Sequence, residues 1–120
     1  MPRIISKHRV FAYNFVDENR KDALYWRDVD TLDAYYEANM DLVEVTPEFN
    51  LYDLDWPIRT RIVQQPPAKF VFAHAGRRMG VTMDSIVSAG CISSGGRVTR
   101  TELSPGVRVN SWCEVDSCIL

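Results

Sequence analysis

Residues 86–98, IVSAGCISSGGRV, carry the pattern that decides the fold, because apolar residues recur there at every sixth position. With one shift of phase the spacing continues toward the carboxyl end, in two sets of three residues: Ile86, Ile92 and Val98, then Leu103, Val109 and Val115. In a triangular parallel β-helix, each flat face of a coil supplies one inward aliphatic side chain, and small residues occupy the corners. Gly90 and Gly96 are also six residues apart. We therefore expect residues 70–120 to form the first coils of a parallel β-helix.

A proline-rich stretch, residues 47–69, precedes the repeat. Pro47, Pro57, Pro66 and Pro67 fix the backbone φ and remove hydrogen-bond donors. The same stretch is too rich in Phe, Leu, Tyr and Trp to stay loose in water. We expect an ordered linker that runs across a protein surface and packs against the part of the chain before it.

An amphipathic helix is predicted from Thr31 onward. Five apolar residues follow helical spacing at i, i+3, i+4, i+8 and i+11: Leu32, Tyr35, Tyr36, Met40 and Val43. Asp30 or Thr31 can cap the amino terminus of this helix. Because the two tyrosines lie on the apolar stripe, we expect them to pack in a core rather than to contact a substrate.

Two runs before the helix favour β-strands. Residues 9–15 and 23–29 are rich in β-branched and aromatic residues, and a polar run separates them. We expect the two runs to form a β-hairpin, so that Asp28 lies where the second strand ends. Strands and helix together would make residues 1–46 a unit distinct from the β-helix.

Composition and charge exclude several classes of partner. The 120 residues are 46% hydrophobic and 25% charged, with a net charge of −2 and both signs interspersed. Without a run of Lys and Arg, neither nucleic acid nor an anionic membrane surface is an expected partner. No apolar stretch approaches the roughly 20 residues of a membrane span, and the first residues lack a signal-peptide core. We therefore expect a cytoplasmic protein.

The helix and the run before it carry a family signature. Residues 25–42, YWRDVDTLDAYYEANMDL, resemble the YWRDVGT-x-x-AYYxANxDL signature of bacterial ADP-glucose pyrophosphorylases, or glucose-1-phosphate adenylyltransferases. Shorter stretches resemble the linker and the first coils of that family, in the same order: residues 50–53, 55–60, 66–71, 88–92 and 104–111. The resemblance implies an α+β chain in three parts. These are the end of a Rossmann-like nucleotidyltransferase domain at 1–46, the linker at 47–69 and an incomplete left-handed β-helix at 70–120.

The resemblance also implies a reaction. Enzymes of this family convert ATP and glucose 1-phosphate to ADP-glucose and pyrophosphate for glycogen or starch synthesis, and they use Mg²⁺ to hold the triphosphate. Asp28 matches one of the two family carboxylates that bind this metal ion, so it is the expected catalytic and metal-binding residue. Mg²⁺ prefers hard oxygen ligands, usually one or two carboxylates with phosphates and waters. Without the motif, the same Asp28 would be read as a residue that caps a turn.

Two neighbours of Asp28 are candidate substrate-binding residues, because Arg27 could approach a phosphate and Trp26 could form the wall of a sugar pocket. The alternative is that the indole packs in the sheet and the guanidinium extends to solvent. Family activators bind between the catalytic domain and the β-helix, which makes the turn at Ser88, Ala89 and Gly90 the candidate regulatory interface.

The sequence departs from the family pattern in two respects. Asp30 stands where the family has Gly, and we expect it to cap the helix, although it could instead compete for the metal. The sequence also contains no G-G-x-G-T-R-L nucleotide loop, so we expect the chain alone to make no ADP-glucose. Two alternatives stay open: another sugar-phosphate nucleotidyltransferase, or a non-catalytic β-helix module for regulation or oligomerisation, since the family forms homotetramers.

Overall fold

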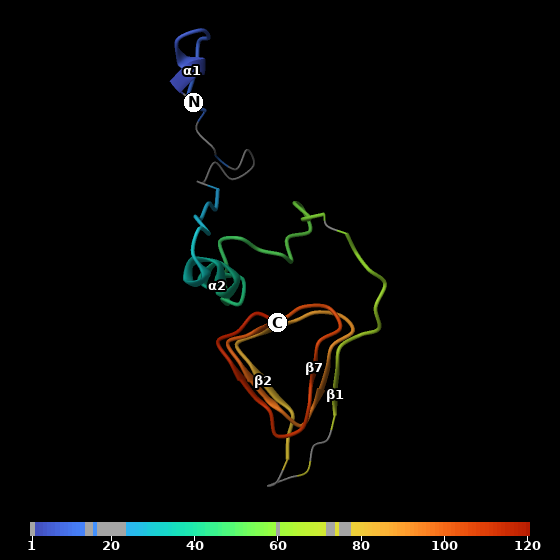
Figure 1. Ribbon diagram of the computed structural model, residues 1–120. Coiled ribbons are helices and arrows are strands. Elements are labelled where there is room, and N and C mark those ends of the chain that lie inside the picture. The colour runs from blue at the N-terminus through green and yellow to red at the C-terminus, as the bar shows by residue number, and fades with distance from the viewer. Residues whose placement is uncertain (1, 14–15, 17–23, 60, 72–73, 75–77) are drawn as a thin grey trace.

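The protein consists of a triangular β-helix preceded by two helices and a linker (Figure 1). The structure is a computed structural model, and it describes residues 2–13, 16, 24–59, 61–71, 74 and 78–120. Helix α1 spans Pro2–Ile5, and helix α2 spans Leu32–Asp41. Neither of these described helices has the length and the apolar run that crossing a membrane would require.

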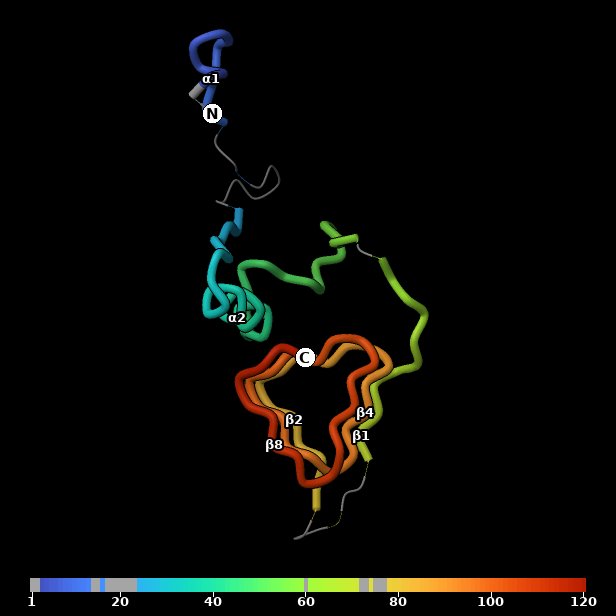
Figure 2. The backbone as a smooth tube through the Cα atoms, viewed as in Figure 1, coloured from blue at the N-terminus to red at the C-terminus, as the bar shows by residue number. Residues whose placement is uncertain are grey.

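Within the described residues, eight short strands form three parallel walls, with strand orders β1-β4-β7, β2-β5-β8 and β3-β6. Their bounds in chain order are β1 Lys69–Val71, β2 Val81–Met83, β3 Ile86–Val87, β4 Ile92–Ser94, β5 Arg97–Thr99, β6 Glu102–Leu103, β7 Arg108–Val109 and β8 Glu114–Asp116. Each strand pairs with the strand one coil later, so the coils lie on top of one another (Figure 2). The predicted parallel β-helix is confirmed.

The prediction that Ile86 and Ile92 point into the β-helix is wrong. Paired residues of a parallel wall point to the same side, and both isoleucines pair with charged residues of the next coil. The residues that follow them hold the inward positions, and these pair with the buried Leu103 and Val109. The cause is coil length, because Glu102 pairs with Ile86 only 16 residues earlier, whereas three six-residue faces would need about 18.

The core of the β-helix is small and contains four buried hydrophobic residues: Cys91, Val98, Leu103 and Val109. Burying a side chain such as Val or Leu stabilises a fold by about 1.5–3 kcal/mol, so these residues hold successive coils together. Two buried hydroxyl groups find partners on the backbone, whereas those of Thr82 and Ser93 have none among the described residues. The Thr101 hydroxyl donates to the carbonyl of Thr99 at 2.8 Å, and the Ser94 hydroxyl donates to the carbonyl of Val109 at 3.3 Å.

Corners of the triangle repeatedly place a residue in the left-handed region of backbone conformation. At the corner that follows β2, β5 and β8, Asp84, Arg100 and Ser117 have φ values of 45°, 45° and 53°. At the corner before β4 and β7, the residues in the left-handed region are Gly90 and Gly106, with φ values of 80° and 85°. Glycine adopts this region at no steric cost, whereas other residues must be held there by their surroundings.

Helix α2 forms where the sequence predicts it, with Thr31 as its N-cap. The Thr31 hydroxyl oxygen accepts a hydrogen bond from the backbone N–H of Ala34 at 3.1 Å. The apolar stripe, however, is not buried: no residue of α2 is buried, and Leu32 is 87% exposed. The prediction that Tyr35 packs in a core is wrong for the part of the chain described here. That ring is 48% exposed, because no described element covers its side of the helix.

The predicted hairpin is not formed by the residues that the structure describes. Residues 9–13 and 24–29 contain no regular strand, and residues 14–15 and 17–23 lie outside the described residues. A strand needs a neighbour to take up its backbone hydrogen bonds, and none of the named strands lies beside these two segments. The hairpin therefore stays a prediction.

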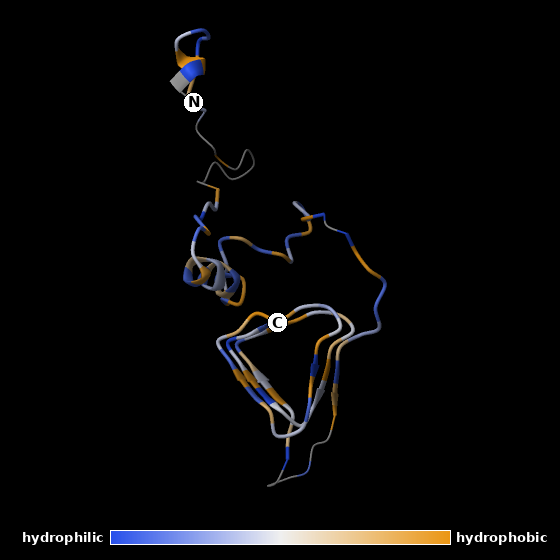
Figure 3. Cartoon of the chain, viewed as in Figure 1, coloured by the Kyte–Doolittle hydropathy of each residue, from blue (hydrophilic) through white to orange (hydrophobic). Residues whose placement is uncertain are grey.

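The linker contains many apolar residues, whose backbone is coloured orange in Figure 3 along the arm between α2 and β1. Leu54 is 92% exposed and Ile62 is 88% exposed. The sequence predicts that the linker packs against the preceding part of the chain, and Phe49 makes one such contact. Its ring stacks on that of Tyr25, with the centroids 5.5 Å apart.

Candidate functional site

Side chains between residues 24 and 28 alternate between half-buried and exposed. Tyr25 and Arg27 are half-buried, whereas Asp28 is exposed and Trp26 is 77% exposed. Such alternation is typical of extended backbone, in which successive side chains point to opposite sides. Tyr25 and Arg27 therefore face α2, whereas the side chain of Asp28 is exposed to solvent.

Two carboxylates of α2 hold Arg27. One guanidinium nitrogen, Nη1, donates to Oδ2 of Asp41, and the other, Nη2, donates to Oε2 of Glu37 at 2.5 Å. The two acids are four residues apart on one face of α2, where like charges repel each other unless a cation lies between them. A planar guanidinium can satisfy two acceptors at once. Because its side chain is 31% exposed and paired, Arg27 does not extend freely into solvent.

Tyr25 completes this cluster and affects its ionisation. The Tyr25 hydroxyl donates to Oδ2 of Asp41 at 2.8 Å, the oxygen that also accepts from Arg27. Partial burial by itself would raise the pKa of Asp41, but hydrogen bonds from Tyr25 and Arg27, with the charge of Arg27, hold that pKa below its usual value. Partial burial, and next the hydrogen bond to Asp41, raise the pKa of Tyr25. At neutral pH Asp41 is therefore ionised, and Tyr25 keeps its proton.

A cavity of about 490 Å³ lies beside this cluster. Trp26 and Arg27 line it together with three carboxylates, those of Asp41, Glu44 and Glu48. One positive and three negative charges make the cavity unfavourable for a free phosphate group. Asp28 is not among the residues that line it.

Asp28 fits a role as one ligand of a hard metal ion. Its carboxylate is exposed, and it forms no hydrogen bond or ion pair with any residue that the structure describes. Within the same described residues no group of three or more acidic, His or Cys side chains could hold a metal by itself. A single free carboxylate agrees with Mg²⁺ binding in which phosphates and waters supply most of the ligands.

The candidate regulatory turn lies elsewhere. The N–H of Gly90 donates to the carbonyl of Pro66 at 2.6 Å, and the carbonyl of Ala89 accepts from the N–H of Gly106 at 3.2 Å. Ser88 bonds to the next coil through its N–H, which donates to the carbonyl of Leu103. These contacts place residues 88–90 against the linker and the next coil, so the structure does not bring them together with Asp28.

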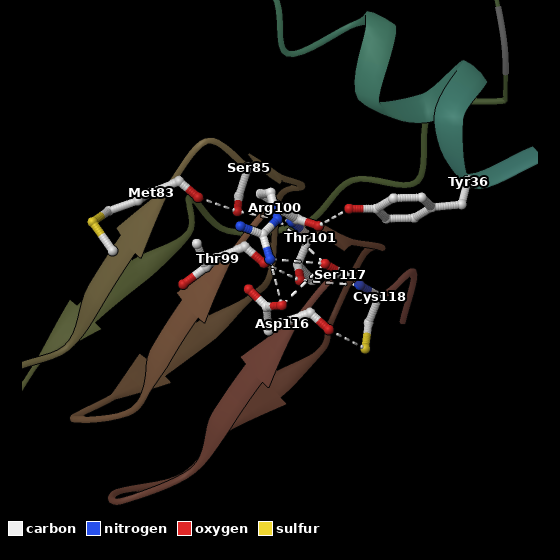
Figure 4. A network of polar contacts seen from close by, with 9 residues as sticks. All are labelled: Tyr36, Met83, Ser85, Thr99, Arg100, Thr101, Asp116, Ser117 and Cys118. Atoms are coloured by element: carbon white, nitrogen blue, oxygen red, sulfur yellow. Dashed lines mark hydrogen bonds and ion pairs between the residues drawn. The ribbon is translucent and has the colours of Figure 1, made fainter. Parts of the chain in front are cut away.

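A different corner of the β-helix contacts α2, as Figure 4 shows. The Tyr36 hydroxyl donates to the backbone carbonyl of Arg100 at 2.8 Å. The Arg100 guanidinium pairs with Asp116 at 2.6 Å, and its Nε donates to the hydroxyl of Ser117 at 3.3 Å. A cavity of about 340 Å³ lies next to this contact, between Arg100 and the residues around the end of α2. Tyr36 therefore joins α2 to the β-helix.

Sequence reasoning missed Glu37 and Asp41 as the partners of Arg27. A usable signal was present, because two acids four residues apart on a helix destabilise it unless a cation lies nearby. Arg27 is the Arg of the same motif. No comparable signal indicates the hydrogen bond of Tyr36, since it joins residues 64 positions apart.

Comparison with known proteins agrees with these observations. Residues 66–120 match the model of a family described as GlmU-like, C-terminal hexapeptide. All 120 residues align with the glucose-1-phosphate adenylyltransferase of Koribacter versatilis at 62% identity and cover 28% of its length. The enzymes of the same name from Rhodopirellula baltica and Methylococcus capsulatus are 55% and 53% identical, again over the whole chain, which covers 27% and 28% of their lengths.

The chain thus spans between a quarter and a third of the length of the relatives it matches. The match includes the signature at residues 25–42 as well as the β-helix, because the alignment covers every residue. The resemblance indicated by the motifs is confirmed: along its whole length, this chain is similar to a segment of the glucose-1-phosphate adenylyltransferases.

Proposed function

We propose that this chain is part of a glucose-1-phosphate adenylyltransferase, which makes ADP-glucose and pyrophosphate from ATP and glucose 1-phosphate. The observation that carries the proposal is the placement of Asp28, which lies in the motif shared with that family and presents an exposed carboxylate bonded to no described residue. Similarity to enzymes of that name over all 120 residues supports it.

The reaction depends on position and charge more than on covalent chemistry from the protein. A phosphate oxygen of glucose 1-phosphate attacks the α-phosphorus of ATP, and one P–O bond forms while the bond to pyrophosphate breaks. Mg²⁺, when bound, offsets the negative charge of the phosphates. Asp28 would supply one carboxylate ligand to it, and Tyr25 and Arg27 would keep the segment that carries Asp28 against α2.

Of the two candidate substrate-binding residues, Trp26 suits its role better. Its indole is exposed and lines the cavity beside Arg27, which supports a place in the wall of a sugar pocket. Arg27 is already bonded to two carboxylates, so direct contact with a phosphate would require these ion pairs to break.

The finer assignments belong to the same proposal. For the fold, they are the end of a Rossmann-like domain at residues 1–46 and a left-handed β-helix. For the assembled protein, they are a homotetramer, a cytoplasmic location and a regulatory interface at residues 88–90. Resemblance to the family supports all of them. The contact between Gly90 and Pro66 also supports the interface, because it couples that turn to the linker.

A chimaera tests the proposed activity, with this chain replacing the matching segment of the Koribacter versatilis relative. We expect the chimaera to release pyrophosphate from ATP when glucose 1-phosphate and Mg²⁺ are present. The Asp28→Asn variant should lose about two orders of magnitude in rate, as when other charge-stabilising groups are removed. Asp30→Asn is the matched control, because it removes another exposed carboxylate two residues away. An Asp28→Asn chimaera as active as the parent would contradict the proposal.

A non-catalytic oligomerisation module is a second candidate. It is favoured by the distribution of buried residues, since the buried hydrophobic cluster lies in the β-helix and no residue of α2 is buried. Light scattering on the 120-residue chain separates the two functions in combination with the chimaera. A discrete oligomer together with an inactive chimaera would favour the module.

A further inference from the structure

We propose that Arg27 is a positioning residue for Asp28, an inference that rests on the function proposed above. The side chain of Arg27 does not point toward the metal ligand. It binds two carboxylates of α2 and thereby fixes the backbone from which Asp28 projects. The two residues are neighbours, so their α-carbons are separated by one planar peptide unit of about 3.8 Å.

The first step is that the segment is attached to α2 through alternate residues. Tyr25 and Arg27 both reach Oδ2 of Asp41, and Arg27 also reaches Glu37 at 2.5 Å. This attachment leaves the side chain after Arg27, that of Asp28, exposed and bonded to no described residue. Asp28 is therefore presented outward without needing a partner of its own.

The second step concerns rigidity. A carboxylate that binds metal must be held in place, and side chains that hold such ligands affect metal affinity nearly as strongly as the ligands do. Within the described residues, no strand hydrogen bonds hold residues 24–29 in place. The polar cluster, with the stack of Tyr25 on Phe49, is what fixes this segment.

The third step separates positioning from direct substrate contact. The positive charge of Arg27 is surrounded by the carboxylates of Asp41 and Glu37, which leave the cluster with an excess of negative charge. Such a cluster does not attract a phosphate. Loss of Arg27 should therefore weaken metal binding, with little effect on the affinity for glucose 1-phosphate.

The experiment uses the same chimaera with Arg27→Lys, Arg27→Gln and Asp41→Asn. Asp116→Asn is the matched control, because it also removes the carboxylate of an Arg–Asp ion pair, at a corner of the β-helix. Three quantities are measured for each variant: the Mg²⁺ concentration at half-maximal rate, the KM for glucose 1-phosphate, and Mn²⁺ binding followed by electron paramagnetic resonance in the presence of a non-reactive ATP analogue.

In Arg27→Gln and Asp41→Asn, we expect the half-saturating Mg²⁺ concentration and the dissociation constant of Mn²⁺ to rise together by about tenfold or more. In Arg27→Lys the change should be smaller, because the lysine ammonium keeps the positive charge but lacks the planar guanidinium that donates to two carboxylates at once. Melting temperatures near that of the parent identify the folded variants. If Arg27→Gln does not fold, Arg27→Lys decides the question.

Two results would overturn the inference. A rise in the KM for glucose 1-phosphate with unchanged metal dependence would make Arg27 a phosphate contact. Metal binding no weaker than in Asp116→Asn would make the cluster merely structural. Neither result bears on the proposed function, which fails if the parent chimaera is inactive or if Asp28→Asn leaves its activity intact.

Discussion

The β-helix and the segment around α2 are held together in opposite ways. In the β-helix, buried Val98, Leu103 and Val109 and the pairing of successive coils hold the chain. Around α2 no helix residue is buried, and ion pairs of Arg27 make the main contact with the preceding segment. Apolar packing is insensitive to pH and salt, whereas exposed ion pairs are screened and titrate. The proposed site should therefore respond to solution conditions that leave the β-helix unchanged.

Among the variants that test this difference between the β-helix and α2, Leu103→Ala should cause the largest loss of unfolding free energy. Leu103 is 1% exposed inside the β-helix, and truncating a buried leucine costs about 2–5 kcal/mol of unfolding free energy. Leu32→Ala is the matched control, because this leucine of α2 is 87% exposed. Urea unfolding followed by circular dichroism measures both. Equal losses would show that the two regions do not differ in packing.

The next effect is expected from Gly96→Ala, again in the β-helix. A Cβ at Gly96 would lie 2.6 Å from Cγ1 of Val109 and 2.8 Å from the carbonyl oxygen of Asn110. Overpacking of this kind costs about 1–3 kcal/mol. Gly106→Ala is the comparison, since its Cβ would meet open space and only its φ of 85° is unfavourable, at about 1 kcal/mol. Similar melting temperatures for the two variants would contradict the crowding at Gly96.

A smaller and local effect is expected from Thr31→Ala, which removes the N-cap of α2. Loss of such a cap costs about 1 kcal/mol. Amide hydrogen exchange should become faster in α2, while the amides of β5 and β6 keep their protection. Thr31→Ser keeps a hydroxyl that can accept from Ala34 and should restore the slow exchange in α2. Faster exchange throughout the β-helix would show that the two regions unfold as one unit.

The smallest effect is a pH dependence from Asp41. The pKa of Asp41 is lowered in the folded protein, so its stabilising contribution is fully present above the unfolded value of about 3.9 and is lost as pH falls through the folded value. Because the side chain is 34% exposed, we expect at most about 1 kcal/mol. Protection factors of the amides in α2, each normalised to the intrinsic exchange rate at the same pH, measure it from neutral to acidic pH. Asp41→Asn should flatten the dependence, and an unchanged slope would contradict this role.

Much of the fold could be predicted from spacing within short windows. The stripe from Leu32 and the cap at Thr31 predict α2, because a helix depends on residues within one or two turns. The six-residue recurrence predicts stacked parallel coils, although it places Ile86 and Ile92 one position from the inward residues. Gly96 shows a similar limit, because its spacing of six residues from Gly90 predicts the same role at a corner. Its φ, however, is not left-handed. A glycine is needed there because a Cβ atom would collide with the neighbouring coil.

The candidate site was less accessible to sequence reasoning. Asp28 could be selected from the signature around it, and the structure leaves its carboxylate exposed. The partners of Arg27 were missed, since Glu37 and Asp41 lie 10 and 14 residues further along, and the spacing of the two acids indicates a nearby cation without indicating which one. The stripe around Tyr35 gave a misleading expectation of burial, because a periodic pattern does not say whether another element covers it.

Local spacing along the chain was therefore enough to specify the helix, its cap and the stacking of coils, and the resemblance to a family signature selected the residue proposed to bind metal. Contacts in three dimensions decided which side of each wall faces inward, which carboxylates hold Arg27 and which corner of the β-helix meets Tyr36. The physical reason is that side chains of extended backbone alternate at every residue, so a corner shorter by one residue reverses every position after it. Contacts between distant segments, in turn, depend on how the long loop between them closes, and a short stretch of sequence does not specify this.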